Sequence, residues 1–377
     1  MHEPNDKRVF SKEALSLAKA GHEVTHLCPG DARYAGFYSG VRTVTYIPPQ
    51  GMAGRLQQLV NLYRKASKLN ADAYHCNEVD SWVIGVFLRI FRKKICVFDV
   101  HEHYPSTFAE SRFPVFIRPF ISMLILVLFR ILIPFTDRIV LAKETVSADF
   151  HTSNAKKVLV KNYTPLEAIK FTTAGHQGRE NSSGVLIHLG LFSKNRGWPQ
   201  VLEAMALMKH KDIKLKVIGR INDGTQTEFQ KRVEKLGLKE CVQVYDWMPF
   251  DEAFEHLQSA HVGIIAFQPG ILNHVYAMPH KMFDYMAAGM AVVCPEFAVE
   301  VAPVVEETCC GLLINPASPE DIATKLDYLL SDRERLADMG HRGKYAVQKK
   351  YNWEAESKKL LKMYAEFEMH KITKNNS

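Results

Sequence analysis

The 377 residues are too many for one comfortable hydrophobic core and suit two domains. With 47% hydrophobic and 24% charged residues, the composition excludes a wholly disordered protein. The net charge of +7 is uneven, because residues 1–165 carry 22 Lys and Arg against 14 Asp and Glu, whereas the remainder carries 26 against 27. A basic first half indicates an anionic partner, and an anionic membrane is preferred to nucleic acid, which only the charge supports.

The seven cysteines are scattered and form no CxxC pair. An odd number of scattered thiols is typical of a reducing compartment. The opening MHEPNDKRVF lacks the apolar core of a signal peptide. We therefore expect a cytoplasmic protein.

Short β-rich runs alternate with helical runs in the first half, which predicts parallel βα units. Helices are predicted at Lys7–Ala20 and Arg55–Leu69, and strands at Glu23–Cys28, Val41–Ile47, Ala73–Cys76, Ile95–Val100, Arg138–Ala142 and Lys157–Lys161. A doubly wound domain normally begins with a strand that becomes central in its sheet. This sequence opens instead in a loop before a helix, so we expect the first strand to be missing, with the true start upstream or the chain shortened.

A stretch rich in Thr, Gly, Asn and Ser between Asn162 and Gly184 is the best candidate for a linker. A second βα series follows it. Its strands are predicted at Val185–Leu189, Ile213–Ile218, Val242–Tyr245, Val262–Ala266, Ala291–Cys294 and Gly311–Ile314, and its helices include Pro199–Met208, Thr227–Leu236 and Ile322–Leu330. The fold class is therefore α/β, with two Rossmann-like doubly wound domains, 1–165 and 166–352, and a ligand cleft at the carboxyl ends of the strands.

The segment Ala277–Gly289 reads as a loop, a helix from about His280, and a glycine stop. Free N–H groups at the helix start and the Lys281 ammonium would together bind a pyrophosphate. Asp284 lies one turn further along the same face, where its carboxylate could accept hydrogen bonds from a ribose. The alternative is a surface Lys–Asp pair beside a packed apolar face.

The loop GLFSKNRG, Gly190–Gly197, follows a predicted strand and precedes a helix. This geometry lets the backbone approach a phosphate, and Arg196 adds a bidentate donor. The loop alone is a weak signal. With Lys281, however, two cations from separate βα loops could clamp a diphosphate without a metal. No GxGxxG follows a strand, which argues against a dehydrogenase.

In the first half, DVHEH places His101 and His103 at the carboxyl end of the strand Ile95–Val100. The two histidines are two residues apart and no third ligand is indicated, so we expect no metal site. The alternatives are a polar loop histidine and a histidine that contacts the substrate.

The run Phe113–Phe135 is the most apolar of the chain. Arg118 and Arg130 interrupt it, which fits a helix lying flat on a membrane better than one crossing it. A helix buried against the sheet is the alternative. The basic surplus of the first half favours peripheral contact of 113–135 with an anionic membrane.

Taken in order, these motifs resemble the bacterial family 4 glycosyltransferases of the GT-B fold. The pieces that carry the resemblance are HEPNDKRVFSKEALSLAKAGHEV, DVHEHYP, VLVKNY, HLGLFSKNRG, PHKMFDYMAAGMAVVCP, GLLINPASPEDIATKL and YNWEAESKKLLKMY. The resemblance implies two domains facing across a cleft, with a C-terminal helix at about 353–370 that packs back on the first.

It also implies that the sugar of a UDP- or GDP-sugar is transferred with retention of configuration, without a metal or another cofactor. The acceptor would be a glycan or lipid-linked molecule, in surface polysaccharide or lipopolysaccharide synthesis at the inner face of the plasma membrane.

The same resemblance assigns roles to individual residues. Arg196 and Lys281 would hold the donor diphosphate with the Gly190 loop, Asp284 the ribose, and His101 the sugar near its reacting carbon. The opening loop residues His2, Asp6 and Arg8 would lie on the acceptor side.

Two positions depart from the family. It often has two glutamates separated by seven residues, where this chain has Tyr276 and Asp284, so Tyr276 would stand in the donor site. Leu191 stands where many members have arginine. The alternatives to a transferase are a sugar-nucleotide 2-epimerase of the same architecture and a non-catalytic sugar-nucleotide-binding protein.

Overall fold

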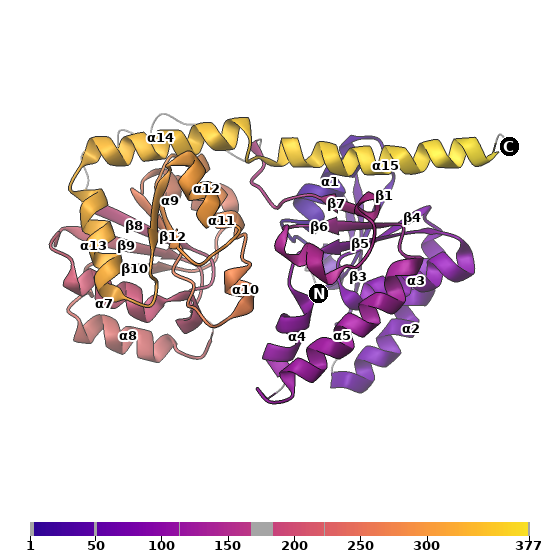
Figure 1. Cartoon of the computed structure of the whole chain (residues 1–377), viewed down its shortest axis with the longest axis horizontal. Coiled ribbons are helices and arrows are strands. Elements are labelled where there is room, and N and C mark those ends of the chain that lie inside the picture. Colours follow the sequence, from indigo (N-terminus) through magenta and orange to yellow (C-terminus); the bar gives the residue numbers. More distant parts are fainter. Residues whose placement is uncertain (1–3, 49–50, 113, 167–183, 222, 376–377) are drawn as a thin grey trace. The chain divides into compact units, whose positions relative to one another are not determined.

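A computed structural model of the chain describes residues 4–48, 51–112, 114–166, 184–221 and 223–375. The chain divides into two compact units, which Figure 1 shows in full. Unit 1 comprises residues 1–162 and 353–377, and unit 2 comprises residues 163–352. The unit boundary therefore falls just before residue 165, where the first domain was predicted to end. The proposed linker lies almost wholly in 167–183, outside the described residues.

Unit 2 is built on one parallel six-stranded sheet with the order β10-β9-β8-β11-β12-β13. Its strands are β8 (Gly184–Leu189), β9 (Ile213–Ile218), β10 (Val242–Tyr245), β11 (Val262–Ile264), β12 (Ala291–Pro295) and β13 (Gly311–Ile314). The first strand, β8, is central and pairs with both β9 and β11. This is the doubly wound order, in which the loop after the first strand lies at a topological switch point.

Helices cover both faces of this sheet, because alternate strand residues point to opposite faces. The side chains of Val185 and Ile187 join one buried cluster and that of Leu186 joins the other. The first face is covered by α9 (Phe250–Gln258), α11 (His280–Ala287), α12 (Ala302–Thr308) and part of α14 (Arg333–Lys349), and the second by α7 (Trp198–Leu207), α8 (Gln226–Lys235) and α13 (Pro319–Leu330). The short helix α10 (Leu272–Val275) precedes α11.

Unit 1 contains two separate sheets, with the orders β1-β3-β2 and β4-β5-β6-β7. Their strands are β1 (Val24–Pro29), β2 (Gly36–Tyr38), β3 (Val41–Tyr46), β4 (Ala73–Cys76), β5 (Ile95–Val100), β6 (Arg138–Leu141) and β7 (Lys157–Leu159). All pairings are parallel except β2 with β3. In the described part of the chain, β1 pairs with β3 alone and β4 with β5 alone, so no described strand joins the two sheets.

Helices nevertheless span both sheets of unit 1. One buried cluster joins Leu27 of β1 and Tyr74 of β4 through α2 (Gly51–Leu69) and α3 (Val79–Arg92). A second cluster, on the other face, joins Val24 of β1 to Val97 of β5 through α1 (Leu15–Lys19) and the C-terminal helix. Shared helix layers therefore hold the two sheets as halves of one layer.

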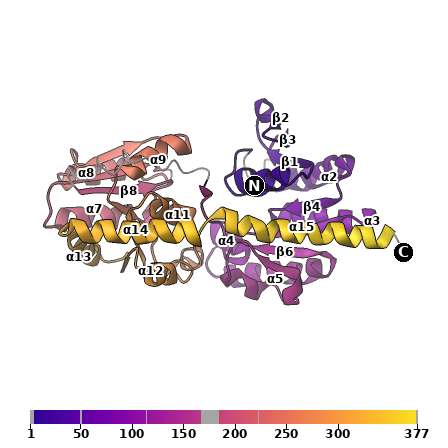
Figure 2. The same ribbon diagram turned by 90° about the horizontal axis from the view of Figure 1, so that it is seen from above.

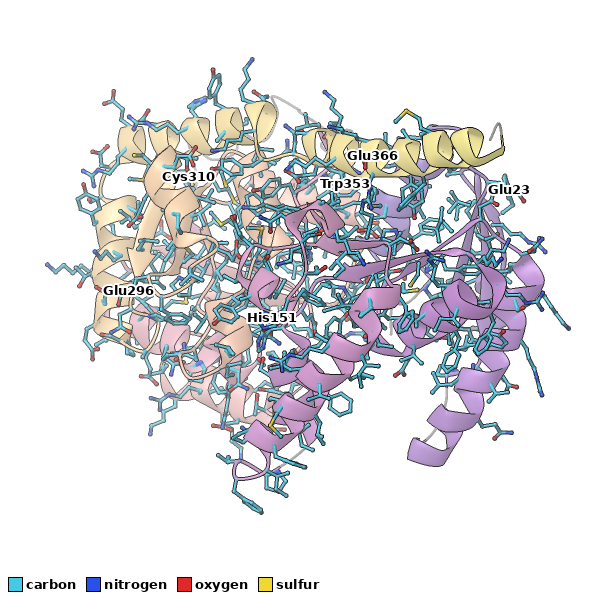
Figure 3. The ribbon with its side chains drawn as sticks, turned by 45° about the vertical axis from the view of Figure 1, so that its right-hand side comes forward. Glu23, His151, Glu296, Cys310, Trp353 and Glu366 are labelled. Atoms are coloured by element: carbon cyan, nitrogen blue, oxygen red, sulfur yellow. The ribbon has the colours of Figure 1, made fainter. Side chains whose placement is uncertain are left out.

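The C-terminal helix is α15 (Trp353–Asn375), which belongs to unit 1 although it follows unit 2 in the chain. The indole of Trp353 donates to the Ser16 hydroxyl at 2.8 Å, and Arg138 pairs with Glu366 at 3.1 Å. Figure 3 labels Trp353 and Glu366 on this helix. The predicted C-terminal helix at about 353–370 therefore does pack back on the first domain.

Two local predictions need correction. The predicted helix Lys7–Ala20 is a π-helix, η1 (Val9–Ala14), followed by α1. The antiparallel strand β2 was missed, because its three residues are all exposed and show no alternation.

The apolar run of unit 1 forms α5 (Arg118–Leu132) and the 3-10 turn η3 (Ile133–Phe135) after it, beside α4 (Tyr104–Arg112). Within the described residues, one helical stretch, Arg118–Phe135, is long and apolar enough to cross a membrane, and only 17% of it is buried. The alternative of a helix buried against the sheet therefore holds for one face, which includes Phe129, Leu132 and Ile133, and not for the other.

Candidate functional site

The loop after β8 is shaped by two glycines. Gly190 has φ +90° and donates its N–H to the Ile218 carbonyl at 2.7 Å. Gly219, at the end of the neighbouring strand β9, has φ +141°, and a Cβ there would lie 2.3 Å from the Gly190 carbonyl oxygen. Only glycines allow the two backbones to approach this closely. The loop therefore leaves the sheet with a bare backbone at the carboxyl end of the central strand.

The loop continues through the turn η7 (Lys194–Arg196) to Gly197, which has φ +82°. A Cβ at Gly197 would lie 2.2 Å from the Ala266 carbonyl oxygen, so the loop packs tightly on the chain after β11. The Gln268 N–H donates to the Asn195 carbonyl at 2.9 Å. These contacts fix Arg196, whose guanidinium lies 5.7 Å from the centre of the Phe267 ring.

Lys281, in the first turn of α11, reaches the same place from another element. Its Nζ lies 5.9 Å from the centre of the same Phe267 ring and 3.8 Å from a Cβ built on Gly190. The side chain is buried, and burial together with the charge of Arg196 holds its pKa well below the usual value. The two predicted cations, Arg196 and Lys281, thus converge beside the Gly190 loop, and burial lowers the pKa of Arg196 as well.

The start of α11 adds further donors to this place. Its N-cap is Pro279, and no side chain caps the helix there. The Tyr285 hydroxyl accepts the Leu189 N–H at 2.8 Å, which ties α11 to the end of β8. Backbone N–H groups at a helix start, the buried Lys281 and the half-buried Arg196 are the kinds of group that bind a phosphate.

Three residues at this place, His188, His274 and Phe267, were missed by the sequence analysis. His188, fully buried in β8, has its Nε2 3.2 Å from Lys281 Nζ and 3.0 Å from the Leu191 carbonyl oxygen, and burial and Lys281 hold its pKa well below the usual value. His274 stacks on Phe267 with ring centres 4.8 Å apart. The available signals were a histidine inside an apolar strand before a glycine, and an aromatic residue just after β11.

Asp284 and Tyr276, the other predicted donor residues, have different surroundings. Asp284 is 2% exposed, and its Oδ1 accepts the Thr164 hydroxyl at 2.5 Å. The alternative of a surface Lys–Asp pair is therefore wrong, since Lys281 is buried too. Tyr276 is half-buried and ends α10. The ribose contact of Asp284 and the place of Tyr276 in the donor site stay predictions.

In unit 1, His101 follows β5 and has its Nδ1 3.8 Å from Asp99 Oδ2. Asp99 is fully buried and receives a bidentate pair of hydrogen bonds from Arg8, with Nε to Oδ2 at 2.9 Å and Nη2 to Oδ1 at 2.6 Å. Burial opposes ionisation of Asp99, but Arg8 outweighs it and holds the pKa of the carboxyl well below its usual value. His101 therefore lies beside a permanent negative charge that could orient its ring.

The same cluster includes a second buried carboxyl group, Glu13. Its Oε1 lies 3.1 Å from Arg8 Nη2, and Asn77 donates to its Oε2 at 3.2 Å. Burial and the neighbouring Asp99 raise the pKa of Glu13 to about 8, against the opposing charge of Arg8. Burial lowers the pKa of nearby His75 to about 4.

Glu13, His75 and Asp99 form a group that could hold a metal ion, since their ligand atoms lie within 4.8 Å of one another. The Arg8 guanidinium contacts both carboxyl groups, however, and already supplies positive charge there. The residues fit a buried ion-pair network better than a metal centre, because a divalent cation would face this guanidinium.

The predicted acceptor-side residues lie in the opening segment. His2 lies outside the described residues. Asp6 accepts the N–H groups of Arg8 and Val9 at 2.8 and 2.9 Å, and so begins η1. Arg8 is 4% exposed and also donates to the Val160 carbonyl at 3.1 Å. The Arg8 side chain is buried in unit 1 and that of Asp6 is half-buried, and their contact with an acceptor stays a prediction.

Two family models match the chain. Residues 8–160 match the model described as Glycosyltransferase Family 4, and residues 172–346 match the model described as Glycosyl transferases group 1. The fold and the paired matches define a glycosyltransferase of the GT-B class. The chain belongs to the family 4 glycosyltransferases. No match to a curated protein sequence was found.

Several solved structures share the fold. Sucrose-phosphate synthase from Thermosynechococcus elongatus has a TM-score of 0.76 at 17% identity, over 95% of this chain and 92% of that one. HepE from Anabaena in complex with UDP has a TM-score of 0.71 at 13% identity, over 93% and 94%. WaaG, a glycosyltransferase involved in lipopolysaccharide biosynthesis, has a TM-score of 0.66 at 14% identity, over 93% and 94%. At these identities the likeness establishes the fold, and the family models indicate glycosyl transfer rather than epimerisation.

Proposed function

We propose that this protein transfers a hexose from a UDP- or GDP-sugar to a glycan or lipid-linked acceptor, with retention of anomeric configuration. The observation that carries the proposal is the convergence of Lys281 and Arg196 beside the bare backbone of Gly190. Two cations and a helix start at one place suit a diphosphate. HepE, of the same fold, binds UDP, which supports a nucleotide sugar as the donor.

The mechanism follows from where charge develops. As the bond between the sugar carbon and the diphosphate oxygen breaks, negative charge grows on the departing diphosphate and positive charge on the sugar ring. Lys281 and Arg196, held in place before the reaction, would stabilise the departing group by electrostatics. These cations perform the task for which other enzymes use a metal ion, so we propose that transfer requires neither a metal nor another cofactor.

On the sugar side, His101 is proposed to contact the donor near its reacting carbon. Asp99, fixed by Arg8, would keep one ring nitrogen of His101 directed inward and the other available to the sugar. Retention is proposed from the resemblance of the motifs to the family. The pathway is proposed to be surface polysaccharide or lipopolysaccharide synthesis at the cytoplasmic face of the membrane; WaaG, of the same fold, is involved in lipopolysaccharide biosynthesis.

Turnover tests the proposal. The protein is incubated with UDP-glucose, UDP-N-acetylglucosamine or GDP-mannose, with and without lipid-linked oligosaccharide acceptors and with EDTA, and released nucleoside diphosphate is measured. We expect that one donor supports acceptor-dependent release of nucleoside diphosphate and that EDTA does not affect it. When the donor is α-configured, NMR of the product should show an α-glycosidic linkage.

Lys281→Ala should lower kcat/KM by roughly 100-fold, since a charge-assisted contact with the departing group is lost. The matched control, Lys214→Ala, removes an exposed lysine of β9 and should change little. Interconversion of sugar isomers without an acceptor would support the epimerase, and binding without turnover would support the binding protein. Either result contradicts the proposal.

A further inference from the structure

The outer face of α5 is apolar and exposed. Its side chains recur every three or four residues, which places them on one side of the helix. The members on α5 are Phe120, Met123, Leu124, Val127 and Ile131; Val115 and Phe116 lie in the turn before the helix and Phe135 in η3 after it, and all eight are at least 42% exposed. Phe116 is 81% exposed, which is unusual for a side chain of this size. A continuous exposed stripe of this kind marks an interaction surface.

The opposite face of α5 is already used. Phe129 and Leu132 are buried in the core of unit 1, and Ile125, Leu126 and Leu128 pack partly against it. The stretch Arg118–Phe135 is long and apolar enough to cross a bilayer, but its inner face holds side chains of this core. Crossing a bilayer would remove these side chains from the core of unit 1, whereas lying along a membrane surface would leave them in place.

The neighbouring helix α3 also carries exposed apolar side chains. Phe87, Ile90 and Phe91 are 47%, 44% and 65% exposed on its outer side. The two helices share one core, in which Trp82 of α3 meets Phe129 of α5 with ring centres 5.3 Å apart. Figures 1 and 2 show α3 and α5 on the same side of the sheet β4–β7. The exposed apolar side chains thus belong to one helix layer.

The charge of this layer is strongly positive. Helices α2, α3 and α5 carry eight basic residues against one acid, Asp80. The basic residues are Arg55, Arg64, Lys65, Lys68, Arg89, Arg92, Arg118 and Arg130. One of them, Arg89, is paired with Asp137 at 2.9 Å. Lys93 and Lys94 follow α3 directly and add to the excess. An apolar stripe flanked by cations complements the acyl and headgroup regions of an anionic bilayer.

We propose that α3 and α5 form a docking face that binds unit 1 peripherally to an anionic lipid bilayer. Phe116, Phe120 and Phe91 would enter the boundary between headgroups and acyl chains, and the arginines and lysines would contact lipid phosphates. A second copy of the chain would cover the apolar side chains but would bring like charges together, which favours the lipid surface. The inference rests on the side chains of unit 1 and deepens the proposed function, since docking would bring the enzyme to a lipid-linked acceptor.

Vesicle flotation tests the inference with the full chain. Vesicles of phosphatidylcholine alone are compared with vesicles that also contain phosphatidylglycerol. The wild type should float with the anionic vesicles only, and added salt should weaken its binding. Phe120→Glu with Leu124→Glu, and separately Phe91→Glu, should each lower the vesicle-bound fraction by at least about tenfold, because a charge replaces buried apolar area.

Leu207→Glu serves as the control, because Leu207 is a 54% exposed apolar residue of unit 2, and its replacement should leave binding unchanged. Equal binding to neutral vesicles, or no binding to either, overturns the inference. A dimer in sedimentation velocity that Phe120→Glu dissociates would assign the face to a second copy and also overturn it. Thermal shifts with UDP on the same variants separate the two proposals, since a docking variant should retain the donor response of the wild type.

Discussion

The loop after the first strand of unit 2 and the opening segment of unit 1 are held in place by different interactions. In unit 2 the first strand, β8, lies between two partners, and backbone hydrogen bonds fix the loop that follows it. In unit 1 no described strand lies between β1 and β4, and the opening segment is fixed by side chains instead. Arg8 bonds Asp99 at the end of β5 and the carbonyl of Val160 after β7.

This difference affects how each unit should respond to substitution. A backbone ladder spreads its stabilisation over many bonds, so no single side chain is decisive. A buried ion pair concentrates the stabilisation in two side chains, because removing one partner leaves the other charge buried without compensation. Unit 1 should therefore depend on a few charged residues, and unit 2 on the close approach of its backbone segments.

The largest effect is expected from Arg8→Ala. It leaves Asp99 and Glu13 without their shared cation and should lower the stability of unit 1 by about 3–5 kcal/mol. Differential scanning calorimetry should show an earlier transition for unit 1 and an unchanged one for unit 2. Arg138→Ala, which breaks the more exposed pair with Glu366, should cost less than about 1 kcal/mol. Equal costs for the two variants would contradict the comparison.

Gly197→Ala tests unit 2 in the same way. Gly197 has a positive φ, and a Cβ built on it would lie 2.2 Å from the Ala266 carbonyl oxygen. A methyl group has no room there, so we expect a loss of about 2–3 kcal/mol and weaker donor binding. Gly224→Ala is the matched control. Gly224 has a similar φ of +78° but no atom within 4 Å of its Cβ, so only about 1 kcal/mol should be lost. A Gly197 variant as stable as the Gly224 variant would refute the close packing of this loop.

A smaller effect concerns pH. The pKa of Glu13 rises from 4.5 to about 8 on folding, so the folded chain keeps a proton that the unfolded chain has lost. The resulting stability is fully present below pH 4.5 and is lost as the pH rises through 8. Between pH 6.5 and 8 the wild type should lose about 1–2 kcal/mol relative to Glu13→Gln.

The window above pH 6.5 avoids the opposite contribution of His75. Its pKa is lowered to about 4, so the stability it provides is present above pH 6.5 and lost as the pH falls through 4. Urea unfolding at several pH values measures the difference, with Glu23→Gln as an exposed control. Parallel curves for wild type and Glu13→Gln would show that Glu13 is ionised in the folded protein.

Much of the fold could be predicted from the sequence because short apolar runs alternate with helices. Strands such as Ala73–Cys76, Ile95–Val100 and Ile213–Ile218 were placed at their observed bounds. Lys281 and Arg196 could be placed together because both follow strands whose carboxyl ends share one edge. Antiparallel β2 could not be found, since it is short and exposed.

The burial of the charged residues and their long-range partners could not be predicted from the sequence. Asp284 reads as a polar residue of an amphipathic helix, but Thr164, 120 residues away, gives it a buried hydrogen-bond partner. Arg8 reads as a charged residue near a loop, and only the packing of η1 against β5 brings it to Asp99. The shared ring of Phe267 is likewise a tertiary contact with no local pattern.

The central claim is that unit 2 holds the nucleotide through Arg196 and Lys281. Calorimetric melting with and without excess UDP and GDP tests it most directly, because a ligand stabilises only the folded unit that binds it. For the wild type we predict that one nucleotide raises the transition of unit 2, and that Arg196→Ala with Lys281→Ala abolishes the rise while Lys214→Ala retains it. A rise that survives the double substitution, or that falls on unit 1, would contradict the account.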